Sequence, residues 1–230
     1  MSVPNRTTDF SEQQGWLTYA TNSDTVDYLA QAYLLALSVK TNCTINKFAI
    51  AVDKNTMECI TPKQRLVFDY IIVIPDSKPM HNEWRSWNIT PFKETFKVES
   101  DMIITTNIDH WWTAMQKYNI CMSSNVRNYK GEISQDKTYR RLFVDNHLPD
   151  VYNGFMYFRH SQGAVEFFNV VKDVFDNFSL YRDTLLDNCR YEEPDTDVAM
   201  AIAAHTLEDK CYSNTLSYPT FTHMKSGINN

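Results

Sequence analysis

The fold class is decided by three short apolar runs: Trp16-Leu-Thr-Tyr-Ala20, Lys47-Phe-Ala-Ile-Ala-Val52 and Tyr70-Ile-Ile-Val-Ile74. Between the first two runs, apolar residues recur at helical spacing over residues 26–40, and residues 61–68 predict a shorter helix before the third run. Short buried strands that alternate with helices are typical of a largely parallel sheet. The sequence therefore predicts an α/β protein.

The remainder of the chain continues this alternation. The further elements that the sequence predicts are helices at residues 91–96, 108–118, 161–178 and 195–204, an apolar segment at 98–105 and a strand at 152–158. Residues 121–150 are polar with little periodicity, and we expect a long excursion or a small hairpin pair there. No repeat, linker or low-complexity stretch interrupts the 230 residues, so we expect one domain, with residues 1–12 frayed.

Composition excludes several classes of protein. A hydrophobic fraction of 43% with 22% charged residues is ordinary for a folded soluble chain. The net charge of −6 carries no general signature for nucleic-acid or membrane binding, and five glycines argue against glycine-rich phosphate loops. No stretch approaches the ~18 apolar residues of a membrane span. Five scattered cysteines and an N-terminus without an apolar signal core favour a reducing, cytoplasmic location without a membrane or an obligate protein partner.

Two carboxylates near position 100 are the first candidates for chemistry. Glu99 and Asp101 are two residues apart beside an apolar run, so both would project from one face at the end of a strand. Carboxylate oxygens are the ligands that hard divalent cations prefer. The alternative is that both are the solvent-facing side of an edge strand.

The surrounding run, Glu99-Ser-Asp101-Met-Ile-Ile-Thr-Thr-Asn107-Ile-Asp109, resembles the metal-binding DxD segment of glycogenin-like glycosyltransferases (glycosyltransferase family 8 and relatives). Other segments are similar to that family in the same order along the chain: Thr18–Tyr28, Asn153-Gly154, Glu193-Pro-Asp195-Thr-Asp197, and His223 with Lys225. Glu99 stands in place of the first Asp of the triplet, and Thr196 in place of a Gln.

This resemblance implies a single GT-A domain, with a Rossmann-like, mixed but mainly parallel sheet flanked by helices. It also implies metal-dependent transfer of a hexose or pentose from a nucleotide sugar, most often a UDP-sugar, with retained anomeric configuration. Glu99, Asp101 and His223 would bind Mn²⁺ or Mg²⁺, and a neutral imidazole suits Mn²⁺ better. The residues that would surround the nucleotide are Thr18, Ala20, Asn22, Tyr28, Lys93 and Lys225.

Two residues are the candidates for catalysis. Asp195 would contact the sugar or stabilise an oxocarbenium-like transition state, and its alternative role is to cap a helix after Pro194. Asn153 would bind sugar hydroxyls, or simply end a strand. Two of the nucleotide candidates also have ordinary alternatives, because Lys93 would suit an exposed helix face and Tyr28 a protein core.

The acceptor is less constrained. Residues 89–101 and 108–112 also resemble compact transferases of tailed bacteriophages, some of which modify hydroxymethylated bases of phage DNA, such as hydroxymethylcytosine. The cations that would contact DNA phosphates in that case are Arg127, Lys130, Lys137, Arg140 and Arg141. The alternatives are a saccharide or cell-surface glycan acceptor, a catalytically silent nucleotide-sugar binder, and a metal nuclease, which more often has a denser carboxylate cluster.

Overall fold

The computed structural model describes residues 12–75, 79–124, 126–133, 140–207, 212–213 and 219–224, without the side chains of 79–81 and 212–213. In this part of the chain, seven strands form one sheet in the order β3-β2-β1-β4-β7-β5-β8. The strands are β1 (Glu12–Tyr19), β2 (Phe48–Val52), β3 (Tyr70–Val73), β4 (Phe92–Val98), β5 (Ile120–Ser124), β7 (Val151–Arg159) and β8 (Tyr212–Ser213). A separate pair consists of β6 (Arg127–Asn128) and β9 (Thr222–His223). Of the residues expected to be frayed, 1–11 lie outside the described chain, whereas Glu12 is the first residue of β1.

The sheet is mixed but mainly parallel. Strand β1 pairs in parallel with β2 and β4, β2 pairs in parallel with β3, and β5 pairs in parallel with β8. Strand β7 runs antiparallel between β4 and β5. All five residues of β2 are buried, as expected for a strand covered on both faces. The predicted α/β class with a mainly parallel sheet is confirmed.

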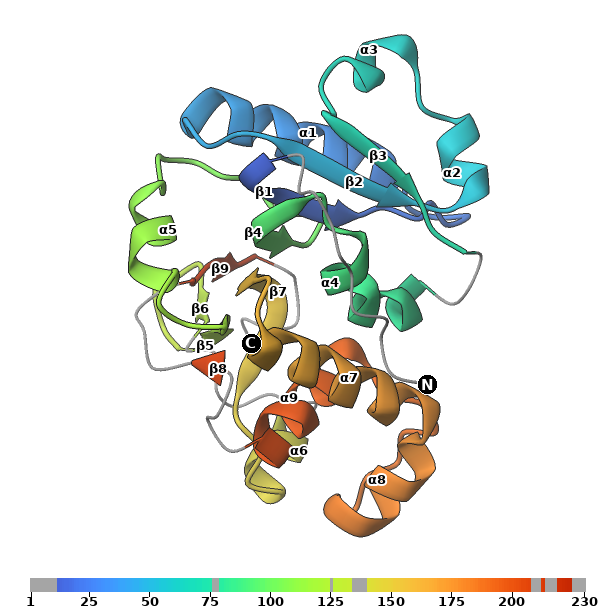
Figure 1. Ribbon diagram of the computed structural model, residues 1–230. Coiled ribbons are helices and arrows are strands. Elements are labelled where there is room, and N and C mark those ends of the chain that lie inside the picture. The colour runs from blue at the N-terminus through green and yellow to red at the C-terminus, as the bar shows by residue number, and fades with distance from the viewer. Residues whose placement is uncertain are drawn as a thin grey trace.

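Helices cover both faces of this sheet (Figure 1). The helical elements are α1 (Tyr28–Asn42), α2 (Lys54–Glu58), α3 (Pro62–Arg65), the 3-10 helix η1 (Pro79–Arg85), α4 (Ser86–Ile89), α5 (His110–Met115), α6 (Arg141–Asp145), α7 (Gln162–Asp176), α8 (Phe178–Leu185) and α9 (Thr196–Leu207). Helices α1 and α5 share a core with β4, whereas α7 and α9 share one with β5 and β7. No helix in the described chain has the length and apolar character needed to cross a bilayer.

The segment predicted as a helix at residues 91–96 is instead strand β4. Local spacing favoured a helix start at Pro91, but the strand lies between β1 and β7, which pair with its two edges. Its residues Phe96 and Val98 are fully buried in the core below α1. Burial between two neighbouring strands therefore overrides the local preference. The strand ends at Val98, so Glu99 and Asp101 lie in the turn that follows it.

Strand β7 contains an irregularity that shapes the site. Met122 of β5 is opposite Met156, but the next residue, Ser123, is opposite Tyr152, so Asn153–Phe155 lie outside the regular register with β5. The hydroxyl of Ser123 donates to the carbonyl of Phe155 at 2.7 Å, which fixes the displaced segment. Bulges of this kind redirect side chains locally. Here the bulge lies beside the end of β4.

Candidate active site

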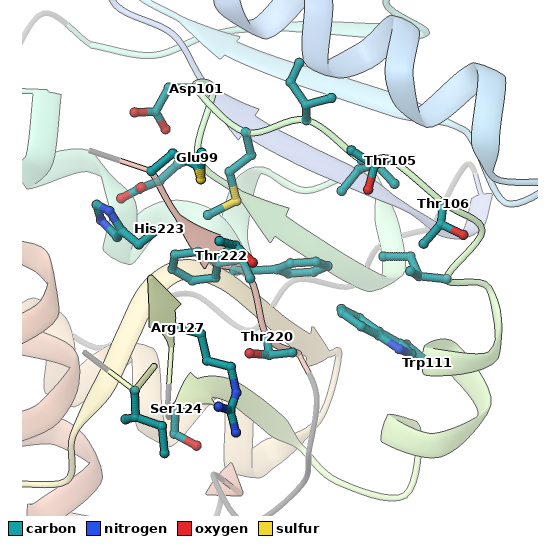
Figure 2. Close-up of a pocket in the computed structure, with 18 residues that line it drawn as sticks. Glu99, Asp101, Thr105, Thr106, Trp111, Ser124, Arg127, Thr220, Thr222 and His223 are labelled. Atoms are coloured by element: carbon teal, nitrogen blue, oxygen red, sulfur yellow. The ribbon is translucent and has the colours of Figure 1, made fainter. Parts of the chain in front are cut away.

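A cavity of about 1160 Å³ opens beside the carboxyl end of β4 (Figure 2). Four segments line it: the turn and loop after β4, the end of β5 with β6 and the residues after it, the bulge of β7, and the segment that contains β9. Figure 2 shows Glu99, Asp101 and His223 on one side of the cavity and Thr105, Thr106 and Trp111 on the other. One end of the cavity therefore carries two carboxylates and an imidazole, and the other end carries two threonines and a tryptophan.

Glu99 is held against the bulge of β7. Its backbone N–H donates to the carbonyl of Gly154 at 2.8 Å. A Cβ atom on Gly154 would lie 3.2 Å from Oε2 of Glu99, 3.2 Å from Cζ of Phe221 and 2.9 Å from Cε of Met102. A glycine at this position therefore lets the carboxylate and the ring of Phe221 approach the backbone of β7.

His223 reaches the same cavity from the far end of the chain. Strand β9 pairs in parallel with β6, with His223 opposite Asn128. One residue before β9, the ring of Phe221 packs edge-on against Tyr152 at the start of β7, with 6.0 Å between centroids. These two contacts place the imidazole near the carboxylates that follow β4. Lys225, the predicted phosphate contact, lies outside the described residues.

The donor types at this end of the cavity suit a divalent cation. Carboxylates together with an imidazole suit Mn²⁺, and carboxylates alone suit Mg²⁺. In the described chain, no group of three or more His, Cys, Asp and Glu side chains is placed closely enough to hold a metal ion. Glu99, Asp101 and His223 thus have residue types that suit such an ion and line one cavity, but their described side chains do not form a metal site.

The loop after β1 lies at the same edge of the sheet, because Leu17 and Lys97 are opposite each other in neighbouring parallel strands. The residues predicted to bind the nucleotide at the end of β1 and in this loop make hydrogen bonds within the protein. Thr18 is buried and donates from Oγ1 to the carbonyl of Val98 at 2.8 Å. Ala20 is buried, and its N–H donates to the carbonyl of Ala51.

The other two residues predicted for this loop are also engaged within the protein. Asn22 accepts from the N–H of Leu29 at 2.8 Å through Oδ1, which fastens the loop to α1. Tyr28 is the first residue of α1 and packs against the core below it. The helix is capped by Asp27, which accepts from Ala30. None of Thr18, Ala20, Asn22 and Tyr28 is among the described residues that line the cavity.

Lys93 does not belong to this site. It is exposed near the start of β4, where its carbonyl accepts from His160. Glu99 is six positions further along the extended chain, which corresponds to roughly 20 Å at the usual rise per residue. The prediction that Lys93 lines the donor pocket is therefore corrected, because the segment is an extended strand rather than a helix. The lysine near the site is Lys97, which is 1% exposed.

Asn153 is part of a buried polar network behind the wall of the cavity. Its Nδ2 donates to the carboxylate of Glu83, which also pairs with Lys97. The ammonium of Lys97 donates to the backbone carbonyl of Asn153 at 3.1 Å. The Oδ1 atom of Asn153 is buried and has no hydrogen-bond partner among the described residues.

The start of α9 carries two carboxylates with different partners. Asp195 accepts from the N–H of Val198 at 2.7 Å and so caps the helix. Asp197 accepts from the N–H of Asn153 at 2.7 Å and from Arg140 at 3.0 Å. Burial raises the pKa of Asp195 above its usual range. Burial also raises the pKa of Asp197 to about 7, although Arg140 and the amide of Asn153 act in the opposite direction.

Arg140 is a structural residue of this site rather than a DNA contact. It is 1% exposed, and it pairs with Asp150 as well as Asp197. Its guanidinium lies 3.8 Å from the ring centroids of both Phe143 and Tyr152. The expectation that it contacts DNA phosphates is therefore wrong. Of the other predicted cations, Lys137 lies outside the described residues, whereas Arg127, Lys130 and Arg141 are exposed.

Sequence reasoning did not single out Glu83 or Lys97, and it assigned Arg140 a different role, as a contact to DNA phosphates. Glu83 is at the end of a 3-10 helix, Lys97 is in a strand predicted to be a helix, and Arg140 follows a polar stretch. The neighbouring sequence does not distinguish these buried charged residues from charged residues on the surface. Asp197 was visible within the segment Glu193–Asp197, but Asp195 was preferred there by resemblance alone.

The fold can be compared with those of known proteins. No model of a protein family matches the sequence, and no curated protein matches it. Mouse xyloside xylosyltransferase 1 is similar in structure, with a TM-score of 0.57 and 10% identity over 88% of this chain and 84% of that one. The glycosyltransferase GlyE of Streptococcus pneumoniae has a TM-score of 0.55 and 9% identity over 88% of this chain and 45% of that one. The chain therefore has the fold of these glycosyltransferases.

Proposed function

We propose that the protein transfers a sugar from a nucleotide-sugar donor, a UDP-sugar, to an acceptor hydroxyl. One observation carries this proposal: Glu99, Asp101 and His223, from distant parts of the chain, line one cavity at the carboxyl end of β4. In open α/β sheets, ligands bind outside the carboxyl ends of the parallel strands. The fold shared with two glycosyltransferases supports the same class of reaction.

Each part of the site has a role in this reaction. Glu99, Asp101 and His223 would hold Mn²⁺ or Mg²⁺, which supplies positive charge to the leaving diphosphate. The loop after β1 would bind the nucleoside through backbone groups, since the side chains of Thr18 and Asn22 are already engaged. Lys225 would add a further positive charge at the diphosphate.

The sugar would lie between the cavity and the start of α9. Asn153 would bind a hydroxyl group, and the carboxylates of Asp195 and Asp197 would stabilise positive charge that develops at the anomeric carbon. The bond from the anomeric carbon to the diphosphate oxygen breaks, a bond to the acceptor oxygen forms, and the acceptor loses its proton. Trp111, on the far side of the cavity, offers an aromatic face for an acceptor glycan. No feature of the described residues favours duplex DNA over a glycan.

The proposal is tested by thermal unfolding and by release of nucleotide. With Mn²⁺ present, one donor among UDP-, GDP-, ADP- and CMP-sugars should raise the unfolding temperature, because a ligand at 100 times its Kd stabilises the native state by about 2.7 kcal/mol. The same donor should slowly release its free nucleotide, which is UDP, GDP or ADP for the diphosphate donors and CMP for a CMP-sugar. Asp101→Asn and His223→Ala should abolish both effects of the metal.

A matched control is Asp176→Asn, which removes an exposed carboxylate on α7 that pairs with Lys172. This variant should bind and hydrolyse donor like the wild type. Stabilisation without release of nucleotide would instead support a silent nucleotide-sugar binder. Absence of stabilisation by every donor would contradict the proposal.

A further inference from the structure

Arg127 brings a positive charge to a cavity that also contains two carboxylates. It is the only lysine or arginine among the described residues that line this cavity. Figure 2 shows its side chain extending away from Glu99 and Asp101, into the part of the cavity that Ser124 and Thr220 line. The charges of the cavity are therefore separated, with carboxylates at one end and a guanidinium at the other.

The backbone of Arg127 is held on both sides. In the pairing of β6 with β9, Arg127 is opposite Thr222, and it also forms an antiparallel bridge with Ile133. The next pair along these strands is Asn128 with His223. Arg127 thus lies beside the strand that carries a candidate metal ligand, and its position is set by two neighbouring segments of backbone.

A tight turn after β6 holds the side chain as well. Nη1 of Arg127 donates to the carbonyl of Gly131, whose φ of 80° is in the left-handed region that favours glycine. The buried side chain of Asn128 fastens this turn, because its Oδ1 accepts from the N–H groups of Lys130 and Glu132 at 2.9 and 3.0 Å. Nδ2 of Asn128 donates to the carboxylate of Glu132 at 2.9 Å. The acidic residue nearest to Arg127 in the sequence is therefore engaged within the turn.

Much of the hydrogen-bonding capacity of Arg127 is unused within the described chain. A guanidinium has N–H donors on Nε, Nη1 and Nη2, and those on Nε and Nη2 donate to no described residue. None of the described carboxylates forms an ion pair with Arg127. The edge formed by Nε and Nη2 binds a carboxylate or a phosphate through two parallel hydrogen bonds. This arginine is therefore able to bind an oxyanion inside the cavity.

We propose that Arg127 forms a subsite for an anionic group of the acceptor, so that the protein transfers its sugar to saccharides that carry a carboxylate or a phosphate. The inference rests on the proposed sugar transfer and adds the chemical class of the acceptor. The diphosphate of the donor would lie at the end with Glu99, Asp101 and His223, where a metal ion offsets the negative charge. A second anion in the cavity is repelled by the carboxylates and attracted by the guanidinium.

A single cation inside a cavity favours a small acidic ligand over duplex DNA. Binding to the phosphate backbone depends on several cations that act together. Lys130 and Arg141 are exposed, but neither is among the described residues that line the cavity. Arg140 is buried and paired with Asp150 and Asp197. The described cations therefore do not form a continuous surface around Arg127.

The first experiment compares acids with their neutral counterparts in the absence of a donor. The methyl glycosides of glucuronic, galacturonic and N-acetylneuraminic acid are each paired with the corresponding amide, and glucose 6-phosphate with glucose. Ligand-observed NMR with Mg²⁺ present gives each Kd. At least one acid should bind roughly 3- to 10-fold more tightly than its counterpart, because an exposed ion pair contributes modestly even when it is bidentate. Added salt should reduce this preference.

Three variants assign the preference to its source. Arg127→Gln should bind the acid and its neutral counterpart equally well. Arg127→Lys keeps the charge but loses the planar fork, so it should retain only part of the preference. The matched control is Lys130→Gln, which makes the same change of charge on the same turn and should keep the full preference.

Several results would overturn the inference. The first is that no acid of the panel binds more tightly than its neutral counterpart. The second is an equal loss in Lys130→Gln and Arg127→Gln, which would mean that anions bind to surface charge, as duplex DNA would. A merely structural role for Arg127, through its hydrogen bond to Gly131, would lower the affinity for acids and neutral counterparts by the same factor.

A second experiment uses the transfer reaction and separates failure of the inference from failure of the proposed function. In Arg127→Gln, the KM for an acidic acceptor should rise roughly 3- to 10-fold, while the KM values for its neutral counterpart and for the donor stay unchanged. A higher KM for the donor would place Arg127 at the diphosphate and contradict the inference. If no donor binds the wild type, the proposed function fails, and the comparison of acids with amides still decides whether Arg127 binds anions. If transfer occurs without any preference for acids, sugar transfer stands and the inference is wrong.

Discussion

Gly154 is the residue through which the cavity is most directly tied to the sheet. Its carbonyl accepts from the N–H of Glu99, and its missing side chain leaves room for Oε2 of Glu99 and the ring of Phe221. Phe221 in turn precedes His223 by two residues. One small residue in β7 therefore permits the two segments with candidate metal ligands to approach each other.

Replacing this glycine should damage the site more than the fold. In Gly154→Ala, the new methyl group presses on Glu99, Met102 and Phe221. We expect the free energy of unfolding to fall by about 1–3 kcal/mol. Metal-dependent release of nucleotide should fall roughly 10- to 100-fold, because the carboxylate is displaced. Chemical denaturation and a nucleotide-release assay measure the two effects.

The control for this change is Gly15→Ala, at a second glycine in the same sheet. A Cβ there would lie 2.4 Å from the ring of Phe92, which is fully buried and distant from the cavity. This variant should lose stability while its folded fraction keeps the wild-type rate. Equal losses of rate in the two variants would show that Gly154 matters only for folding.

Among the elements, α9 has a start that combines capping with candidate chemistry. Asp195 accepts from the N–H of Val198, which satisfies one of the free donors of the first turn. Eight of the twelve residues of this helix are buried, and it packs against β7 and α7, so its position depends on packing along its length. Substitutions of Asp195 can therefore separate its effect on stability, as a helix cap, from its effect on the rate of transfer.

Two substitutions at this position distinguish the cap from catalysis. Asp195→Ala removes the acceptor and should lower the free energy of unfolding by about 1 kcal/mol. Asp195→Asn keeps an oxygen acceptor and should leave stability nearly unchanged. If the negative charge contributes to transfer, both variants should release nucleotide more slowly. A wild-type rate in Asp195→Asn would restrict the residue to capping, and the measurement is the rate at saturating donor beside a denaturation curve.

At the scale of the whole molecule, one buried guanidinium connects three elements in the second half of the chain, α6, β7 and α9. Arg140 precedes α6, pairs with Asp150 before β7 and with Asp197 in α9, and donates to the carbonyl of Val151. Asp197 extends this network to the backbone of Asn153. The stability of the protein should therefore depend on the ionisation of Asp197.

The direction of that dependence follows from the raised pKa. Burial raises the pKa of Asp197 from the ordinary aspartate value of 3.8 to about 7. Between these two values the folded state retains a proton that the unfolded state has lost, so the contribution of Asp197 is fully present below pH ~4 and is lost as the pH rises to about 7. The difference in unfolding free energy between wild type and Asp197→Asn should fall over this range, as measured by urea denaturation. A difference that does not vary with pH would contradict the prediction.

The sequence alone predicts the class of fold, and it names residues for a site whose roles stay predictions. The apolar runs that became β1, β2 and β3 predicted a parallel α/β sheet, because a strand covered on both faces needs continuous apolar residues. Glu99 and Asp101 stand out as two carboxylates beside an apolar run, whereas His223 is named only through the resemblance to glycogenin-like glycosyltransferases. The α/β prediction is confirmed, while the roles of the three residues stay predictions.

Only the tertiary structure decided which residues meet. Strand β4 was mistaken for a helix because its neighbours β1 and β7 are remote in sequence, and the misplaced Lys93 followed from that error. The network of Glu83, Lys97 and Asn153 depends on a bulge in β7 that no local pattern announces. Helical and strand spacing report which face of an element is buried. They do not report which charge lies opposite, since partner and burial are properties of the packed chain.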